Sequence, residues 1–379
     1  MHAPRSISAG VERPPGQAAA ALTVGLEEEV LLVDPRSGAP VACAAEALHR
    51  LGGDPRFKAE LPAGQLEICL PPARSAPEAV AALRTARHDL VSALGELARP
   101  AAAGVHPCAP ARGPLTEGER YEALRAEYGA VAELQQVCAL QVHVAVGDTP
   151  RTIAVHDALR EYLPDIAALA ANAPVYGARD TGVASVRPLI SRLLPRQGVP
   201  PALGDPQAYA AELSWGAQAG AVRDATRWWW ELRPHPVHGT LELRVPDAQT
   251  TLGQATAVIA FVHALVGTIC DELDARGPRP PVPTWRIEEN RWAACRDGLG
   301  ATVTDVRTGV HEPVADRLLD LVAWVGPAAA RLGCATELAT VGELVASGGG
   351  AAAQRREAFA HGVAALPGRL ADRFLDDTV

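Results

Sequence analysis

Lysine is nearly absent from this chain of 379 residues, in which Lys58 is the only lysine among 35 basic side chains. The G-K-[ST] step of a phosphate-binding Walker-A loop is therefore missing, and a lysine Schiff base is disfavoured. The sequence also contains no G-x-S-x-G and no H-E-x-x-H motif, which argues against a serine-hydrolase elbow and a zincin site. If the protein binds a nucleotide, metal ions and arginine must hold the phosphates.

The seven cysteines are dispersed and form no C-x-x-C pair, so neither a zinc knuckle nor a dithiol redox centre is indicated. An odd, scattered set is typical of a reducing compartment. The net charge is −9 and the pI is about 5.7, whereas sequence-independent binding of nucleic acid requires a basic surface. We therefore expect small-molecule ligands and no nucleic-acid partner.

Long apolar segments are also scarce. The first twenty residues lack the continuous apolar core of a signal peptide, and we find no later run of about 18 apolar residues. We expect a cytoplasmic protein without a membrane partner. Residues 1–20 are predicted to be a disordered arm, and residues 21–379 a single domain whose C-terminal part, from about residue 300, is helical.

A segment with three consecutive glutamates, residues 24–33, is the centre of the predicted fold. Strand side chains alternate between two faces, so Glu27 and Glu29 share one face with Gly25. The other face is predicted to enter the core with Val24, Leu26, Val30 and Leu32. Two neighbouring carboxylates repel each other, and the polar face therefore needs a compensating positive charge.

Three more segments repeat this alternation, at residues 65–70, 141–146 and 241–245. Each has Leu, Ile or Val on one face and Glu, His, Gln or Arg on the other. The pattern predicts an α+β fold, with one antiparallel sheet whose polar face lines the active-site cleft and whose apolar face is covered by helices. Half-exposed strands with ordinary polar outer faces are the alternative. The carboxylates recur at the strand centres, however, which favours a bound cation.

Helices are predicted over residues 75–98, 116–137, 152–172, 205–224 and 250–276. Thr116 and Glu119 are expected to form a capping box, and Pro164 to kink or divide its helix. Residues 227–234 and 240–246 are expected to pair as a hairpin. The long segment 173–206 is interpreted as an active-site loop, because loops of this size are usually functional; an ordered surface loop is the alternative. It carries Arg179, Asp180, Ser185 and Arg187.

The assembled motifs resemble the carboxylate–amine ligases of the glutamate–cysteine ligase type 2 family over nearly the whole chain, from about Leu22 to Arg356. The motifs are G-L-E-E-E-V-L-L-V-D at 25–34, E-L-P-A-G-Q-L-E-I at 60–68, H-V at 143–144, A-A-N-A-P at 170–174, D-T-G-V-A-S-V-R at 180–187, E-L-R-P-H-P at 231–236, G-T-L-E-L-R-V-P-D at 239–247 and E-N-R-W-A-A-C-R-D-G-L at 289–299. Together they are specific, although no single one would be.

The resemblance implies the fold of the glutamine synthetase and guanido kinase catalytic domains. It also implies ATP-dependent amide formation through an acyl phosphate, typically between the γ-carboxylate of glutamate and the amine of cysteine. The implied cofactors are ATP and Mg²⁺, with Mn²⁺ as an alternative. The implied partners are amino-acid substrates, and a homodimer is compatible with the resemblance.

The resemblance also assigns site residues. The implied metal ligands are Glu27, Glu29, Glu60, Glu67, His143 and Glu242. The implied catalytic residues are Arg187, Arg233 and Arg244, which would hold the transferred phosphoryl group; ion pairs with neighbouring glutamates are the alternative for each. The implied nucleotide contacts are Glu27, Asn172 and the same three arginines.

The chain departs from the family pattern at three positions near the predicted cleft, where it has Gln141 in place of His, Ala145 in place of Gly and Ala173 in place of Ser. We hypothesise that Gln141 faces the cleft beside His143 and makes cysteine a poor acceptor. A ligase for another carboxylate and amine, and a non-catalytic nucleotide-binding protein, therefore stay open, with a phosphotransferase as a more distant alternative. The identities of both substrates are not fixed by the sequence.

Overall fold

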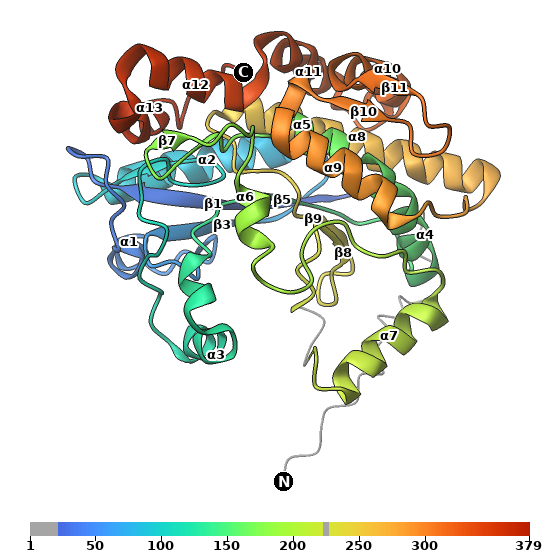
Figure 1. The fold of residues 1–379 in the computed structure, drawn as a ribbon, viewed down its shortest axis with the longest axis horizontal. Helices are drawn as coiled ribbons and strands as arrows, with labels where there is room; N and C mark the ends of the chain where they lie inside the picture. The colour runs from blue at the N-terminus through green and yellow to red at the C-terminus, as the bar shows by residue number, and fades with distance from the viewer. Residues whose placement is uncertain (1–21, 223–226) are drawn as a thin grey trace.

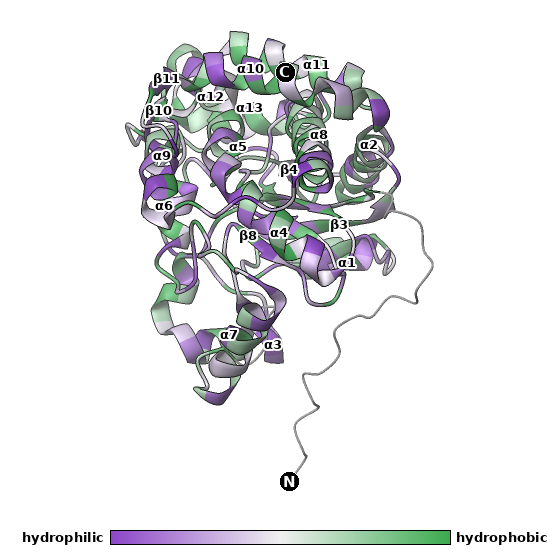
Figure 2. Cartoon of the chain, turned by 90° about the vertical axis from the view of Figure 1, so that its right-hand side faces the viewer, coloured by the Kyte–Doolittle hydropathy of each residue, from purple (hydrophilic) through white to green (hydrophobic). Residues whose placement is uncertain are grey.

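The structure, a computed structural model, describes residues 22–222 and 227–379. The N-terminal arm predicted at residues 1–20 lies outside the described residues. Helices α10 and α11 form an outer layer, helix α8 lies beneath them, and the central sheet lies beneath α8, whereas α3 and α7 project from the opposite side of the sheet (Figures 1 and 2). This arrangement leaves one face of the sheet covered by helices, as the alternation predicts.

The central sheet has seven strands in the order β2-β3-β1-β5-β9-β8, with β4 also paired to β1. Every pairing in it is antiparallel, which confirms the predicted mixed fold with an antiparallel sheet. The strands are β1 (Val24–Val33), β2 (Phe57–Ala59), β3 (Gln65–Ala73), β4 (Arg99–Ala101), β5 (Leu140–Val144), β8 (Leu232–Pro234) and β9 (Leu241–Leu243). Each of the four segments with alternating polarity thus contributes a strand, and β8 and β9 form the predicted hairpin.

The core lies between the sheet and the helices on its back. Leu26 and Val30 of β1 point into it and are buried, and each side chain of this kind stabilises the fold by about 1.5–3 kcal/mol when fully buried. Glu28 shares their face, because it is two residues from each. It is completely buried and forms an ion pair with Arg87 of helix α2 (Ala76–Leu94). The alternation predicts only apolar residues on this face, and Glu28 is the exception.

Helix α8 (Leu252–Arg276) is the longest element of the core. Thr251 and Gln254 form a capping box at its start. Its length and composition would suffice to cross a membrane, contrary to the expectation that no such segment exists, but 94% of its apolar window is buried inside the protein. It packs against α2, α4, α10 and α11, which accounts for its apolar surface.

The other elements connect and cover these layers. The helices are α1 (Ala44–Arg50), α3 (Glu119–Tyr128), η1 (Gly129–Leu134), α4 (Thr149–Leu159), η2 (Arg160–Tyr162), α5 (Leu163–Leu169), α6 (Arg187–Ser191), α7 (Pro206–Gln218), α9 (Thr284–Asp297), η4 (Gly298–Gly300), α10 (Val314–Arg331), α11 (Ala335–Ser347), α12 (Gly349–His361), η5 (Val363–Ala365) and α13 (Leu366–Asp372). Two small hairpins pair β6 (Val175–Tyr176) with β7 (Arg179–Asp180) and β10 (Thr302–Thr304) with β11 (His311–Pro313).

Several predicted boundaries are wrong. The capping box at Thr116 does not form, because the Thr116 hydroxyl donates to the backbone carbonyl of Glu60 at 2.5 Å and helix α3 starts only after Gly118. The expected break at Pro164 is confirmed, since α4 ends at Leu159 and α5 starts at Leu163. Strand β3 continues through Pro71 and Pro72 to Ala73, beyond the alternating segment 65–70.

Candidate active site

The polar face of the sheet forms the floor of a cleft of about 610 Å³. Tyr121 and Tyr128 of α3 line one side of the cleft. Trp229, which precedes β8, and His235, which follows it, line another. The predicted metal ligands converge on this floor. Four of them line the cleft, namely Glu27, Glu29, Glu60 and Glu67. The other two, His143 and Glu242, are buried beside the cleft next to Glu27.

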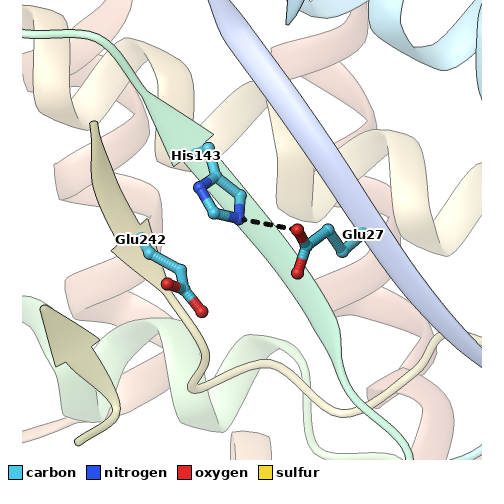
Figure 3. Close-up of side chains that lie close together, drawn as sticks. All are labelled: Glu27, His143 and Glu242. Atoms are coloured by element: carbon cyan, nitrogen blue, oxygen red, sulfur yellow. Dashed lines mark ion pairs between the residues drawn. The ribbon is translucent and has the colours of Figure 1, made fainter. Parts of the chain in front are cut away.

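Glu27, His143 and Glu242, which we call the histidine group, offer ligand atoms that all lie within 4.8 Å of one another. The sheet register creates this group, because His143 pairs directly with Glu242 across β5 and β9, while Gly25 opposite His143 leaves room for the imidazole. Figure 3 shows the three side chains converging from three strands. The His143 Nε2 atom is 3.7 Å from Glu27 Oε1.

His143 is the residue whose surroundings fit a bound cation most clearly. Its side chain is 4% exposed, yet its Nε2 atom has no hydrogen-bond partner among the residues that the structure describes. Its Nδ1 atom contacts the Thr240 hydroxyl at 3.1 Å, which orients the ring, as partners of metal-bound histidines do. An imidazole nitrogen between two carboxylates fits a divalent cation.

Glu29, Glu60 and Glu67, which we call the carboxylate group, also lie within 4.8 Å of one another. Burial, with the charge of Glu60 beside it, raises the pKa of Glu29 to about 7, and burial likewise raises the pKa of Glu60 and, more strongly, of Glu67. Within the described part of the chain, no basic side chain forms an ion pair with any of the three. Their ionised form therefore needs added positive charge, and oxygen ligands of this kind suit Mg²⁺ or Mn²⁺.

Two arginines hold Glu242 from the cleft side. Arg233 donates from Nε and Nη2 at 2.7 and 3.1 Å, and Arg244 donates from Nη1. Burial opposes ionisation of Glu242, but Arg244 and Arg233 outweigh it and hold the pKa of this carboxyl well below its usual range. Both guanidinium groups line the cleft. The ion pairs that we set as the alternative are therefore present, and they place two fixed positive groups beside the histidine group.

Gln141 lies on the same cleft face, as we hypothesised, but its side chain is only 2% exposed. Its amide nitrogen donates to Glu29 Oε1 at 3.1 Å, and its oxygen accepts from Arg244 Nη1. The amide thus connects Glu29 of the carboxylate group to Arg244, which itself pairs with Glu242 of the histidine group. Any influence of Gln141 on the choice of amine would act through these two neighbours.

Arg187 lines the cleft, but most of its donors bind the protein. Its Nε atom donates to Asp247 at 2.6 Å, and its Nη2 atom donates to the carbonyls of Val245 at 2.6 Å and Arg244 at 3.2 Å. Ser185 binds the same Asp247 oxygen at 3.0 Å. This part of the predicted active-site loop therefore supports the backbone beneath Arg244.

Asn172 does not lie in the cleft, so its assignment as a nucleotide contact is corrected. The residue is completely buried, and its amide donates to the Ala248 carbonyl at 2.8 Å and to Thr250 at 3.0 Å, while its oxygen accepts from Gln354 at 2.8 Å. Arg179 and Asp180 are also placed elsewhere, because both are exposed on β7 and Asp180 pairs with Arg355.

Other cleft residues were missed. Lys58 lies opposite Glu67 in the register of β2 and β3 and lines the cleft. Cys69, two residues after Glu67 on β3, donates to the Glu67 carboxylate at 3.0 Å. His235 follows Arg233 on the same strand face. The period of two could have identified Cys69 and His235 once Glu67 and Arg233 were chosen.

Comparisons with known proteins agree with this geometry. The sequence profile of the family described as glutamate–cysteine ligase family 2 matches residues 23–365. A protein of Rubrobacter xylanophilus with the provisional name glutamate–cysteine ligase 2-3 is 38% identical over 341 residues, covering 88% of this chain and 91% of its own. A protein of Arthrobacter sp. with the provisional name glutamate–cysteine ligase 2-1 is 31% identical over 356 residues, covering 90% of this chain and 92% of its own.

Two solved structures share the fold. A glutamate–cysteine ligase of Francisella tularensis in complex with AMP superposes with a TM-score of 0.67 at 13% identity, covering 93% of this chain and 89% of its own. A bifunctional glutathione synthetase of Pasteurella multocida gives a TM-score of 0.63 at 15% identity, covering 93% of this chain and 52% of its own. The family profile and the relatives at over 30% identity carry the assignment, and the chain belongs to glutamate–cysteine ligase family 2, a family of carboxylate–amine ligases.

Proposed function

We propose that the protein is an ATP-dependent ligase that joins the γ-carboxylate of glutamate to an amine, with cysteine as the first amine to test. The observation that supports this most is the convergence of the histidine group, the carboxylate group and two arginines in one cleft. The names of the relatives and the AMP in the Francisella structure add support for the substrate class and for nucleotide binding.

Divalent cations, Mg²⁺ or Mn²⁺, would be held by the histidine and carboxylate groups. Bound there, they would neutralise the charge of the triphosphate and of the phosphoryl group in transfer. The unpartnered His143 nitrogen and the raised pKa values of Glu29, Glu60 and Glu67 fit such an occupant.

In the proposed reaction, a carboxylate oxygen of glutamate attacks the γ-phosphorus of ATP and ADP leaves, which forms an acyl phosphate. The amine nitrogen then attacks the acyl carbon, phosphate leaves and the nitrogen loses a proton. Catalysis of phosphoryl transfer rests mainly on positioning and charge stabilisation. Arg244 is the side chain best suited to this role, because it reaches the cleft while Glu242 and Gln141 fix its guanidinium plane.

The direct test is a screen of amino-acid pairs for ADP release, with the mass of each product determined. We expect ADP release that needs ATP, a divalent cation, glutamate and an amine, and a product whose mass equals the sum of both substrates less one water. ADP release without any condensation product would instead favour a phosphotransferase or an ATPase. Nucleotide binding without ADP release for any pair would favour the non-catalytic alternative.

A further inference from the structure

The turn between β8 and β9, residues 235–240, brings His235 and His238 to the cleft. His235 follows Arg233 by two residues and therefore shares its cleft-facing side, and it lines the cleft. Its ring packs edge-on against His143, with centroids 5.5 Å apart, and stacks on His238, with centroids 4.3 Å apart. The ring is thus held next to the histidine group by contacts on two sides.

The turn itself fixes which nitrogen of His235 carries the proton. The backbone N–H groups of Val237 and His238 both donate to Nδ1, at 3.3 and 3.1 Å. A nitrogen that accepts hydrogen bonds carries no proton, so the ring proton must be on Nε2. Two further bonds close the turn, from the His235 N–H to the Thr240 carbonyl at 2.7 Å and from the Gly239 N–H to the His235 carbonyl at 3.0 Å.

The Nε2–H group of His235 is therefore a donor whose position is set by the backbone. The nearest carboxylate oxygen, Glu242 Oε2, is 3.9 Å from Nε2, which is too far for a hydrogen bond. Both oxygens of Glu242 are already bound by Arg233 and Arg244. Among the residues that the structure describes, this donor therefore has no hydrogen-bond acceptor, and it is available for a ligand beside the histidine group.

We propose that His235 donates a hydrogen bond from Nε2 to an oxygen of the phosphoryl group that the protein transfers, and so binds this group together with Arg244. This inference rests on the proposed function, since it assigns a phosphoryl ligand to the cleft. His235 would act as a neutral donor, which adds no charge to a site already crowded with charged groups. A neutral donor to an anionic oxygen strengthens as charge develops in phosphoryl transfer.

The competing explanation is that His235 only stabilises its own turn. His235→Asn separates the two roles, because the Asn side-chain oxygen takes the place of Nδ1 and accepts from the same backbone N–H groups, while nothing takes the place of Nε2. His235→Gln is the reciprocal variant, since its longer amide presents an N–H near the position of Nε2. His361→Asn, at an exposed position on α12, serves as the control.

The experiment measures ADP release at saturating ATP, Mg²⁺, glutamate and amine, the thermal unfolding midpoint, and Mg²⁺–ATP binding by tryptophan fluorescence. We expect His235→Asn to keep its unfolding midpoint and to lose about 10- to 100-fold in kcat, His235→Gln to recover part of that loss, and His361→Asn to match the wild type. A His235→Asn variant with wild-type kcat would show that the residue only caps the turn. So would a loss of kcat that follows a lowered unfolding midpoint and that His235→Gln does not relieve.

The two proposals fail separately in this experiment. A wild-type protein that binds no Mg²⁺–ATP and releases no ADP overturns the proposed function, and this inference with it. A wild-type protein that binds Mg²⁺–ATP and releases ADP, with His235→Asn equal to it in both, overturns only the role of His235.

Discussion

The two faces of strand β1 differ in how the charge of a buried glutamate is balanced. On the helix side, Glu28 and Arg87 are both completely buried, and the pair is bidentate, with Nε to Oε2 at 2.9 Å and Nη2 to Oε1 at 2.5 Å. Arg87 also donates to the carbonyls of Phe374 at 2.6 Å and Gln249 at 2.8 Å. On the cleft side, Glu29 lies with Glu60 and Glu67 and no ion pair joins this carboxylate group within the described residues.

The difference separates a structural carboxylate from carboxylates that we propose bind a ligand. The charge of Glu28 is neutralised by Arg87 of helix α2. Arg87 thereby connects the sheet to α2 and, through the Phe374 carbonyl, to the C-terminal segment. The carboxylate group has no ion pair within the described residues, and burial raises the pKa of each of its members, so a cation or protons would neutralise it. Buried charge without a partner costs stability, which supports our proposal that this group binds a metal ion.

The strongest test of the comparison is Glu67→Gln. We expect ADP release to fall by about 1,000-fold, because the loss of a coordinating carboxylate removes several kcal/mol of charge stabilisation, while the thermal unfolding midpoint of the metal-free protein stays equal or rises as repulsion is relieved. Activity and unfolding are measured on the same preparation. A variant with at least a tenth of wild-type turnover at equal Mg²⁺ would exclude Glu67 as a metal ligand.

Glu28→Gln should have the reverse effect. Removing one partner of a buried ion pair costs about 3–5 kcal/mol, so the free energy of unfolding in urea should fall by that amount. Glu46→Gln, in an exposed pair with Arg50 on α1, should leave unfolding unchanged. If Glu28→Gln were as stable as the wild type, the contrast between the two faces would be lost.

Arg244→Lys tests the next largest effect. A lysine ammonium keeps the charge but cannot make two parallel hydrogen bonds to a phosphoryl group, so we expect kcat to fall by about 100-fold, the scale seen when one donor to a developing charge is removed. Arg279→Lys, at an exposed position paired with Glu272 at 2.7 Å, should be nearly neutral. Equal activities in the two variants would mean that Arg244 holds no phosphoryl group.

The smallest effect is expected at Gln141. Gln141→His should change the ratio of kcat/KM for cysteine over the best other amine by about tenfold. This is the lower part of the about 1–3 kcal/mol that an unmatched buried polar group costs, because Gln141 acts only through Glu29 and Arg244. The ratio is measured in both forms with the same amines. An unchanged ratio, with a wild type that already favours cysteine, would remove this position from the choice of amine.

Strand alternation made much of the cleft predictable from sequence. It placed Glu27, Glu67 and His143 on one face of a sheet without any knowledge of strand order, because a period of two is a local property. The same alternation also determines that Glu28 lies on the helix-facing side of β1. Its partner could not be predicted, since Arg87 comes from a helix 59 residues away, and long-range pairing leaves no local pattern.

The failures have a common physical cause. Thr116 resembles a helix cap, but a tertiary contact with the Glu60 carbonyl engages its hydroxyl instead. Asn172 matches a family motif, but the motif serves a buried hydrogen-bond network with Thr250 and Gln354. In both cases a distant partner decides the role of a polar side chain. Location in the cytoplasm, a homodimer and the division of the chain into one domain and an arm stay predictions.

We expect the cleft face of the sheet, and not the helix side, to bind divalent cations. The most direct measurement is electron paramagnetic resonance of Mn²⁺ titrated into the metal-free protein with ADP present, for the wild type, Glu27→Gln, Glu67→Gln and Glu46→Gln. We expect the wild type and Glu46→Gln to bind Mn²⁺ equally and the Glu27 and Glu67 variants to lose most of that binding. Undiminished Mn²⁺ binding in both cleft variants, or none in the wild type, would contradict the account.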